Sequence, residues 1–113
     1  MADYVAYWRQ RRADEQADLA RLRAQVHADA RSVAELLRAR YGVTRVLLFG
    51  SLLTDRFAAD SDIDLAVEGL PRAALFAAMG EASALVHRWV DIKPLEELSE
   101  HFLRRVLSTG EEL

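Results

Sequence analysis

The 113-residue chain contains no cysteine and only two prolines, and none of its apolar runs is long. Without cysteine it has no disulfide, no thiolate zinc site and no cysteine nucleophile. No apolar run approaches the ~20 residues that a membrane-spanning helix needs. The first residues, MADYVAYWRQRR, lack the uninterrupted apolar stretch of a secretory signal. We therefore expect no membrane association and a cytoplasmic location.

Charge of neither sign dominates, since 15 Lys and Arg oppose 18 Asp and Glu for a formal net charge of -3. Domains that bind nucleic acid usually carry a strongly basic face, so we expect no direct nucleic-acid partner. The hydrophobic fraction, 51%, is too high for a disordered chain. A chain of this length supports one compact unit with one core.

The first third of the chain is predicted to be helical, because residues 3–40 contain no glycine or proline and are rich in helix-forming residues. We predict one long helix, or two helices joined in the polar stretch between Trp8 and Leu19, ending at Tyr41 with Gly42 as the cap. One apolar stripe at three- and four-residue steps supports this prediction: Leu19, Leu22, Val26, Ala30, Val33 and Leu37.

Apolar and aromatic side chains also gather near the start of this helix, at residues 4–8 (YVAYW). Two interpretations are open. The segment folds back on the domain, or it forms a surface for a partner or for self-association, since Tyr and Trp are enriched in the cores of interfaces.

Short strands and helices alternate from Val43 onward, which predicts an α+β fold in which helices cover a small β-sheet. We divide the chain into an N-terminal helical extension, residues 1–42, and a domain of residues 43–113. The expected elements are a strand over Thr44–Phe49, a strand over Asp62–Val67, a helix over Arg72–Val86 with Pro71 as its first residue, a strand over Arg88–Lys93 ended by Pro94, and a helix over Leu95–Leu107.

Three aspartates in the predicted strands are candidates for a metal site. Asp62 and Asp64 point to one face of their strand, roughly 6.5–7 Å apart, while the intervening apolar residues point to the core. Such carboxylates repel each other unless a cation or proton is present, and hard cations prefer oxygen ligands. Asp91 interrupts the apolar strand WVDI. If the two strands are neighbours, Asp91 completes a three-carboxylate cluster that can hold two metal ions for phosphoryl transfer.

A turn at Gly50-Ser51 follows the first predicted strand. Successive backbone N–H groups exposed by a glycine turn, with a hydroxyl beside them, can cradle the oxygens of a triphosphate. The turn and the aspartates are therefore complementary parts of one site.

The arrangement Gly-Ser, ten residues, Asp-Ile-Asp, within LLFGS and SDIDLAV, resembles the signature of the DNA polymerase β-type nucleotidyltransferase superfamily. It is most similar to the minimal nucleotidyltransferase (MNT) group. The resemblance implies a mixed sheet, two Mg²⁺ ions on Asp62 and Asp64, and ATP phosphates on Gly50 and Ser51. It also implies that Asp91 is the third carboxylate and the base for an acceptor hydroxyl.

The same resemblance implies a biological role. Proteins of this size in the group act as antitoxins in HEPN/MNT toxin–antitoxin systems, some by transferring AMP from ATP to a tyrosine of the HEPN toxin. The residues after the turn depart from the Gly-Ser-Leu-Ala-Arg-Gly of many members, because Thr54 and Asp55 replace Arg and Gly. Arg56 matches the basic residue often found next, and we expect it to contact the nucleotide.

Two other functions remain open on the sequence. The chain could be a small-molecule nucleotidyltransferase that a second subunit completes. Alternatively it is a non-catalytic antitoxin or binding module with a decayed site, for which Thr54 and Asp55 are the supporting feature, because an added carboxylate repels triphosphate.

Overall fold

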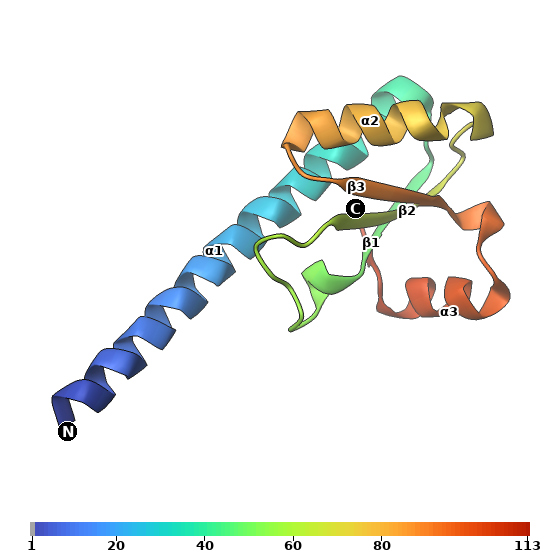
Figure 1. The fold of residues 1–113 in the computed structure, drawn as a ribbon. Helices are drawn as coiled ribbons and strands as arrows, with labels where there is room; N and C mark the ends of the chain where they lie inside the picture. The colour runs from blue at the N-terminus through green and yellow to red at the C-terminus, as the bar shows by residue number, and fades with distance from the viewer. Residues whose placement is uncertain (1) are drawn as a thin grey trace.

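The computed structural model describes residues 2–113 and shows a four-stranded mixed sheet between helices (Figure 1). The strand order is β3-β2-β1-β4, in which β1 is antiparallel to β2 and β4 while β2 and β3 are parallel. The predicted α+β fold with a mixed sheet and a long N-terminal helix is confirmed. The elements are α1 (Ala2–Tyr41), β1 (Arg45–Phe49), η1 (Ser51–Leu53), β2 (Ile63–Glu68), η2 (Arg72–Ala74), α2 (Leu75–Val86), β3 (Val90–Pro94), η3 (Leu95–Glu97), α3 (Glu100–Thr109) and β4 (Glu111–Glu112).

Helix α1 is one unbroken helix of 40 residues, and Gly42, with φ of 69°, adopts the left-handed conformation that ends it. The predicted stripe contacts the core from Leu19 onward. Residues 2–18, which we call the N-terminal arm, are exposed and project away from the sheet (Figure 1). Tyr4 is 65% exposed and Trp8 46%. The expectation that residues 4–8 fold back on the domain is therefore wrong.

The two faces of the sheet are covered by different helices (Figure 1). Alternate apolar residues of β1, β2 and β3 pack with α1 and α2 in the main core, as Leu48, Leu65 and Ile92 do. The other face packs against α3 through a smaller cluster centred on Leu47 and Val106. Because side chains alternate along a strand, the residues between the core positions all belong to the α3 face.

Local chemistry explains where the observed bounds depart from the predicted ones. Pro71 precedes a 3₁₀ turn, so α2 begins only at Leu75. Helix α3 begins at Glu100, not Leu95, because the Ser99 hydroxyl accepts a hydrogen bond from the Phe102 N–H and caps it. The remaining corrections are small: β1 and β2 each begin one residue late, β3 begins two residues late, and β3 includes Pro94.

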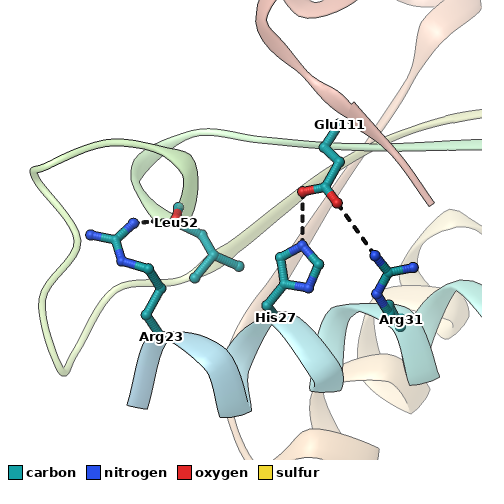
Figure 2. A network of polar contacts seen from close by, with 5 residues as sticks. All are labelled: Arg23, His27, Arg31, Leu52 and Glu111. Carbon is teal, nitrogen blue, oxygen red and sulfur yellow. Dashed lines mark hydrogen bonds and ion pairs between the residues drawn. The ribbon is translucent and has the colours of Figure 1, made fainter. Parts of the chain in front are cut away.

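The short strand β4 was not predicted, and it ties the end of the chain to α1. Glu111 accepts hydrogen bonds from His27 at 2.7 Å and from Arg31 at 3.4 Å (Figure 2). Beside it, Glu112 pairs with Arg45 of β1 at 2.6 Å. Among the described residues, no helix is both long enough and apolar enough to cross a membrane.

Candidate active site

The three predicted aspartates lie at the start of the two parallel strands. Asp64 of β2 and Asp91 of β3 are register partners, so the parallel pairing places their carboxylates side by side. Both are half-buried, and Asp62, which directly precedes β2, is exposed. They lie on the α3 face of the sheet, but α3 packs against β1 and leaves the start of β2 and β3 open. The parallel pairing of β2 and β3 thus brings Asp91 beside Asp64, and a metal site shared by all three aspartates stays a prediction.

Electrostatics within this cluster centre on Asp64. Burial raises the pKa of its carboxyl, the charges of Asp91 and then Asp62 raise this pKa further, and the Lys93 ammonium lowers it. Lys93 lies two residues along β3, and its Nζ is 2.9 Å from the Asp91 Oδ2. One lysine therefore partly offsets the mutual repulsion of three carboxylates.

The donor atoms are of the kind that a hard divalent cation binds. Within residues 2–113, however, no group of three or more histidine, aspartate or glutamate side chains is arranged so that it could hold a metal ion. Carboxylate oxygens are nevertheless the ligands that Mg²⁺ prefers, and a cation would relieve the repulsion that raises the pKa of Asp64. Asp62, Asp64 and Asp91 are the residues that would hold it.

Gly50 stands directly against Asp64. Its φ of 85° lies in the region that favours glycine, and a Cβ placed on it would be 2.4 Å from the Asp64 Oδ2. The register explains this approach, because Phe49, the last residue of β1, is the partner of Asp64. The turn at Gly50 therefore lies against the Asp64 carboxylate, and their use in one nucleotide site stays a prediction.

Two arginines from outside the motif hold the loop between the turn and Asp62. Arg23 of α1 donates a hydrogen bond to the carbonyl of Leu52 at 2.5 Å (Figure 2). It donates a second one to the carbonyl of Thr54 at 2.8 Å. Arg88 donates to the carbonyls of Ala59 and Ser61, at 2.9 and 2.6 Å. Nothing in the sequence distinguishes Arg23 from the other arginines of the same helix, so this role could not be predicted.

The residues that depart from the family pattern have structural roles in the turn. The Thr54 hydroxyl donates to the Ser51 carbonyl and accepts from the Arg56 N–H, both at 3.1 Å. Asp55 and the side chain of Arg56 are exposed at the tip of the loop. Thr54 therefore stabilises the loop without adding charge, whereas Asp55 adds a carboxylate that faces solvent.

A cleft of about 570 Å³ borders the turn on the α3 side. Phe49 and Phe102, in edge-to-face contact with ring centroids 5.7 Å apart, form part of its wall. Its other lining residues are Gly50, Leu53, Thr54, Arg105, Val106 and Thr109. An apolar cleft with one arginine, beside the glycine turn that contacts Asp64, has the composition of a small-molecule site.

The family model described as "Polymerase beta, Nucleotidyltransferase" matches residues 31–113, most of the chain. The chain belongs to the polymerase beta nucleotidyltransferase family. The match includes the turn, all three aspartates and the last part of α1. No curated protein sequence matches the chain.

Solved structures of nucleotidyltransferase-like proteins share the fold. A protein assigned as a minimal nucleotidyltransferase is 28% identical, with 80% of this chain and 95% of that chain covered and a TM-score of 0.68. A toxin–antitoxin structure with AMP-PNP is 24% identical, covering 74% and 70%, with a TM-score of 0.65. A Shewanella oneidensis complex of a tri-AMPylated HEPN toxin with an MNT antitoxin is 22% identical, covering 76% and 69%, with a TM-score of 0.61.

Proposed function

We propose that this nucleotidyltransferase transfers AMP from ATP to a hydroxyl, a tyrosine of a HEPN-type toxin, and acts in the cytoplasm as the antitoxin. The observation that carries the chemistry is the cluster of Asp62, Asp64 and Asp91 on the open part of the sheet, against the Gly50 turn. The acceptor is suggested by the structural neighbours, among them the AMPylated toxin complex.

Each residue of the cluster would have a distinct role. The Gly50 and Ser51 backbone would bind the triphosphate, with Arg56 at the mouth of the site. Asp91 would accept the proton of the acceptor hydroxyl as its oxygen attacks the α-phosphorus and pyrophosphate leaves. Two Mg²⁺ ions, when bound to Asp62, Asp64 and Asp91, would supply charge stabilisation for the phosphoryl oxygens.

The spacing of the first two aspartates has a parallel among the neighbours. One MntA–HepT complex carries Asp→Glu substitutions at two positions that are two residues apart, as Asp62 and Asp64 are. That spacing places both carboxylates on one side of a strand, where they can share ligands. We therefore assign Asp62 and Asp64 the principal share of metal binding.

The test is intact-mass measurement of a HEPN-type toxin protein, after incubation with the chain, ATP and Mg²⁺. We expect one or more added adenylyl groups with the wild-type chain and none with Asp62→Asn/Asp64→Asn. Asp60→Asn is the matched control, because Asp60 is an exposed aspartate in the same loop. It should leave transfer unchanged.

The measurement also separates the other functions. A stable complex without any mass gain, equally stable for Asp62→Asn/Asp64→Asn, would identify a non-catalytic binding module and refute AMP transfer. A wild-type chain that consumes ATP only when a small hydroxyl compound is added would instead identify a small-molecule nucleotidyltransferase.

A further inference from the structure

The N-terminal arm continues the apolar stripe of α1 in a seven-residue repeat that the fold leaves without a partner. From the arm into the core, alternating steps of three and four residues connect positions on one helix face. Apolar residues occupy both ends of this series, and a pair of opposite charges occupies its middle: Val5, Trp8, Arg12, Glu15, Leu19, Leu22 and Val26. We call these seven residues the seam.

Exposure along the seam shows where a partner can be accommodated. Val26 is buried in the domain, but Leu19 and Leu22 are only partly buried where they meet it. In the arm, Val5 is 45% and Trp8 46% exposed. A shallow groove of about 290 Å³ runs over this end of the seam, lined by Tyr4, Val5, Trp8, Arg9 and Arg12. Large apolar side chains exposed together on one face are typical of an interaction surface.

We propose that the seam joins two copies of this chain as an antiparallel two-helix dimer. When a second α1 lies antiparallel, with the twofold axis between residues 13 and 14, the six seam positions from Val5 to Leu22 each meet a complementary one. Val5 then faces the partner's Leu22, and Trp8 faces the partner's Leu19. Arg12 faces the partner's Glu15, and the twofold axis repeats all three pairs.

Arg12 and Glu15, in the middle of the seam, favour a second copy of this chain as the partner and an antiparallel orientation of its helix. In a parallel pair Arg12 would meet Arg12 and Glu15 would meet Glu15, and like charges at such positions are unfavourable. In the antiparallel pair every central charge meets its opposite. Glu15 already lies 3.5 Å from Arg11 of its own helix at 69% exposure, so solvent or a partner can reach it. The seam is complementary to itself, which an unrelated partner does not require.

Mass and charge reversal test the proposal. In light scattering coupled to size exclusion at increasing concentration, the wild-type chain should approach twice its 12.7 kDa mass. Arg12→Glu should weaken dimerisation about tenfold or more, because four carboxylates would then meet at the centre. Glu15→Arg should do the same, and Arg12→Glu/Glu15→Arg should restore the dimer. Arg21→Glu, an equal charge change on the opposite face of α1, is the matched control and should leave it unchanged.

The direction of the helices is tested with single cysteines, since the chain has none of its own. Mixed Arg12→Cys and Glu15→Cys chains should form a disulfide between two copies under mild oxidation. Neither variant alone should do so, because its two cysteines would lie apart along the antiparallel seam. Cross-linking of Arg12→Cys with itself would show a parallel pair and refute the proposed arrangement.

Three further results would overturn the proposal. These are a wild-type mass that stays at one chain at all concentrations, dimerisation unaffected by Arg12→Glu, and a double reversal that fails to restore the dimer. If the chain is monomeric but Trp8→Ala abolishes its binding to the HEPN protein, the arm docks on that protein instead. None of these outcomes depends on AMP transfer, which is measured separately with the aspartate variants.

Discussion

At the scale of single residues, Gly50 and Gly80 form a matched pair. A Cβ at Gly50 would meet the Asp64 carboxylate at 2.4 Å and would force a non-glycine residue to a φ of 85°, whereas a Cβ at Gly80 in α2 has open space around it. We expect Gly50→Ala to lower the free energy of unfolding by about 1–3 kcal/mol and to abolish nucleotide transfer. Gly80→Ala should raise it by about 0.5–1 kcal/mol. Urea unfolding of both variants measures the difference.

A higher free energy of unfolding for Gly50→Ala than for the wild type would contradict this description of the turn. Equal effects of the two substitutions would contradict it as well. The comparison is informative because both changes add the same methyl group. Only the backbone conformation and the neighbouring carboxylate differ.

The Asp64 carboxylate is expected to reduce stability in the absence of a cation. Its pKa is raised by burial and by the charges of Asp91 and Asp62, so its ionised form is unfavourable in the fold. Asp64→Asn should therefore raise the free energy of unfolding at neutral pH by about 0.5–2 kcal/mol in EDTA. Thermal unfolding of the wild type should shift upward with added Mg²⁺, and that of Asp64→Asn should shift less.

Asp60→Asn serves again as the control, and its unfolding temperature should equal that of the wild type both in EDTA and with added Mg²⁺. A wild-type chain whose unfolding temperature ignores Mg²⁺ would speak against metal binding at the cluster. An Asp64→Asn variant less stable than the wild type in EDTA would show that the carboxylate makes a favourable contact instead.

Sequence reasoning located the cluster because its residues break local patterns. An aspartate in the apolar run WVDI is costly without a function, and alternation along a strand places Asp62 and Asp64 together. Arg23 could not be found in this way. Its partners are backbone carbonyls 29 and 31 residues away, and carbonyls carry no sequence signal. Arg88, predicted only as the first residue of a strand, holds the loop at Ala59 and Ser61.

At the scale of elements, the loop from Gly50 to Asp62 is expected to depend on helix α1. Arg23→Met removes two hydrogen bonds to the loop, as well as the contact of its guanidinium with the Phe57 ring at 4.9 Å. We expect faster hydrogen exchange at the Leu53 and Thr54 amides and a fall in nucleotide transfer of roughly tenfold, while the rest of the sheet keeps its protection.

The control is Arg21→Met, which removes an exposed arginine two residues earlier on the same helix. It should leave exchange in the loop unchanged. If Arg23→Met accelerates exchange throughout the sheet, Arg23 supports the whole fold and not the loop alone.

Helices and strands could be predicted where one sequence pattern dominates a segment. They were missed where contacts with residues far along the chain determine the structure. The helix α1 and the strands β1 to β3 follow from periodicity and from glycine and proline positions, whereas the pairing of β2 with β3 was only a condition of the predicted site. Strand β4 consists of two glutamates, residues that strands disfavour. It forms because β1 offers an unpaired edge and because His27, Arg31 and Arg45 hold the two carboxylates. That combination exists only after the chain has folded.

For the whole molecule, the sequence could not decide whether residues 4–8 return to the domain. The folded core is complete without them, since the two clusters enclose the sheet using α1 only from Leu19 onward. An isolated helix gains little stability in water, and most helical stability comes from packing of an apolar face. Among the described residues, the arm is therefore a helix whose apolar face does not contribute to either core cluster. The boundary at residue 42 stays a prediction, although the family match begins at residue 31.

The last prediction concerns the arm and the stability of the whole chain. A chain of residues 18–113 loses only exposed residues and keeps Asp18, a residue suited to cap the shortened helix. At low concentration its free energy of unfolding should therefore lie within about 0.5 kcal/mol of that of the full chain. At high concentration the full chain should become more stable as it dimerises, whereas the shortened chain should not change. Unfolding midpoints measured across a concentration series separate the two contributions. A constant deficit of the shortened chain at every concentration would instead show that the arm stabilises its own domain.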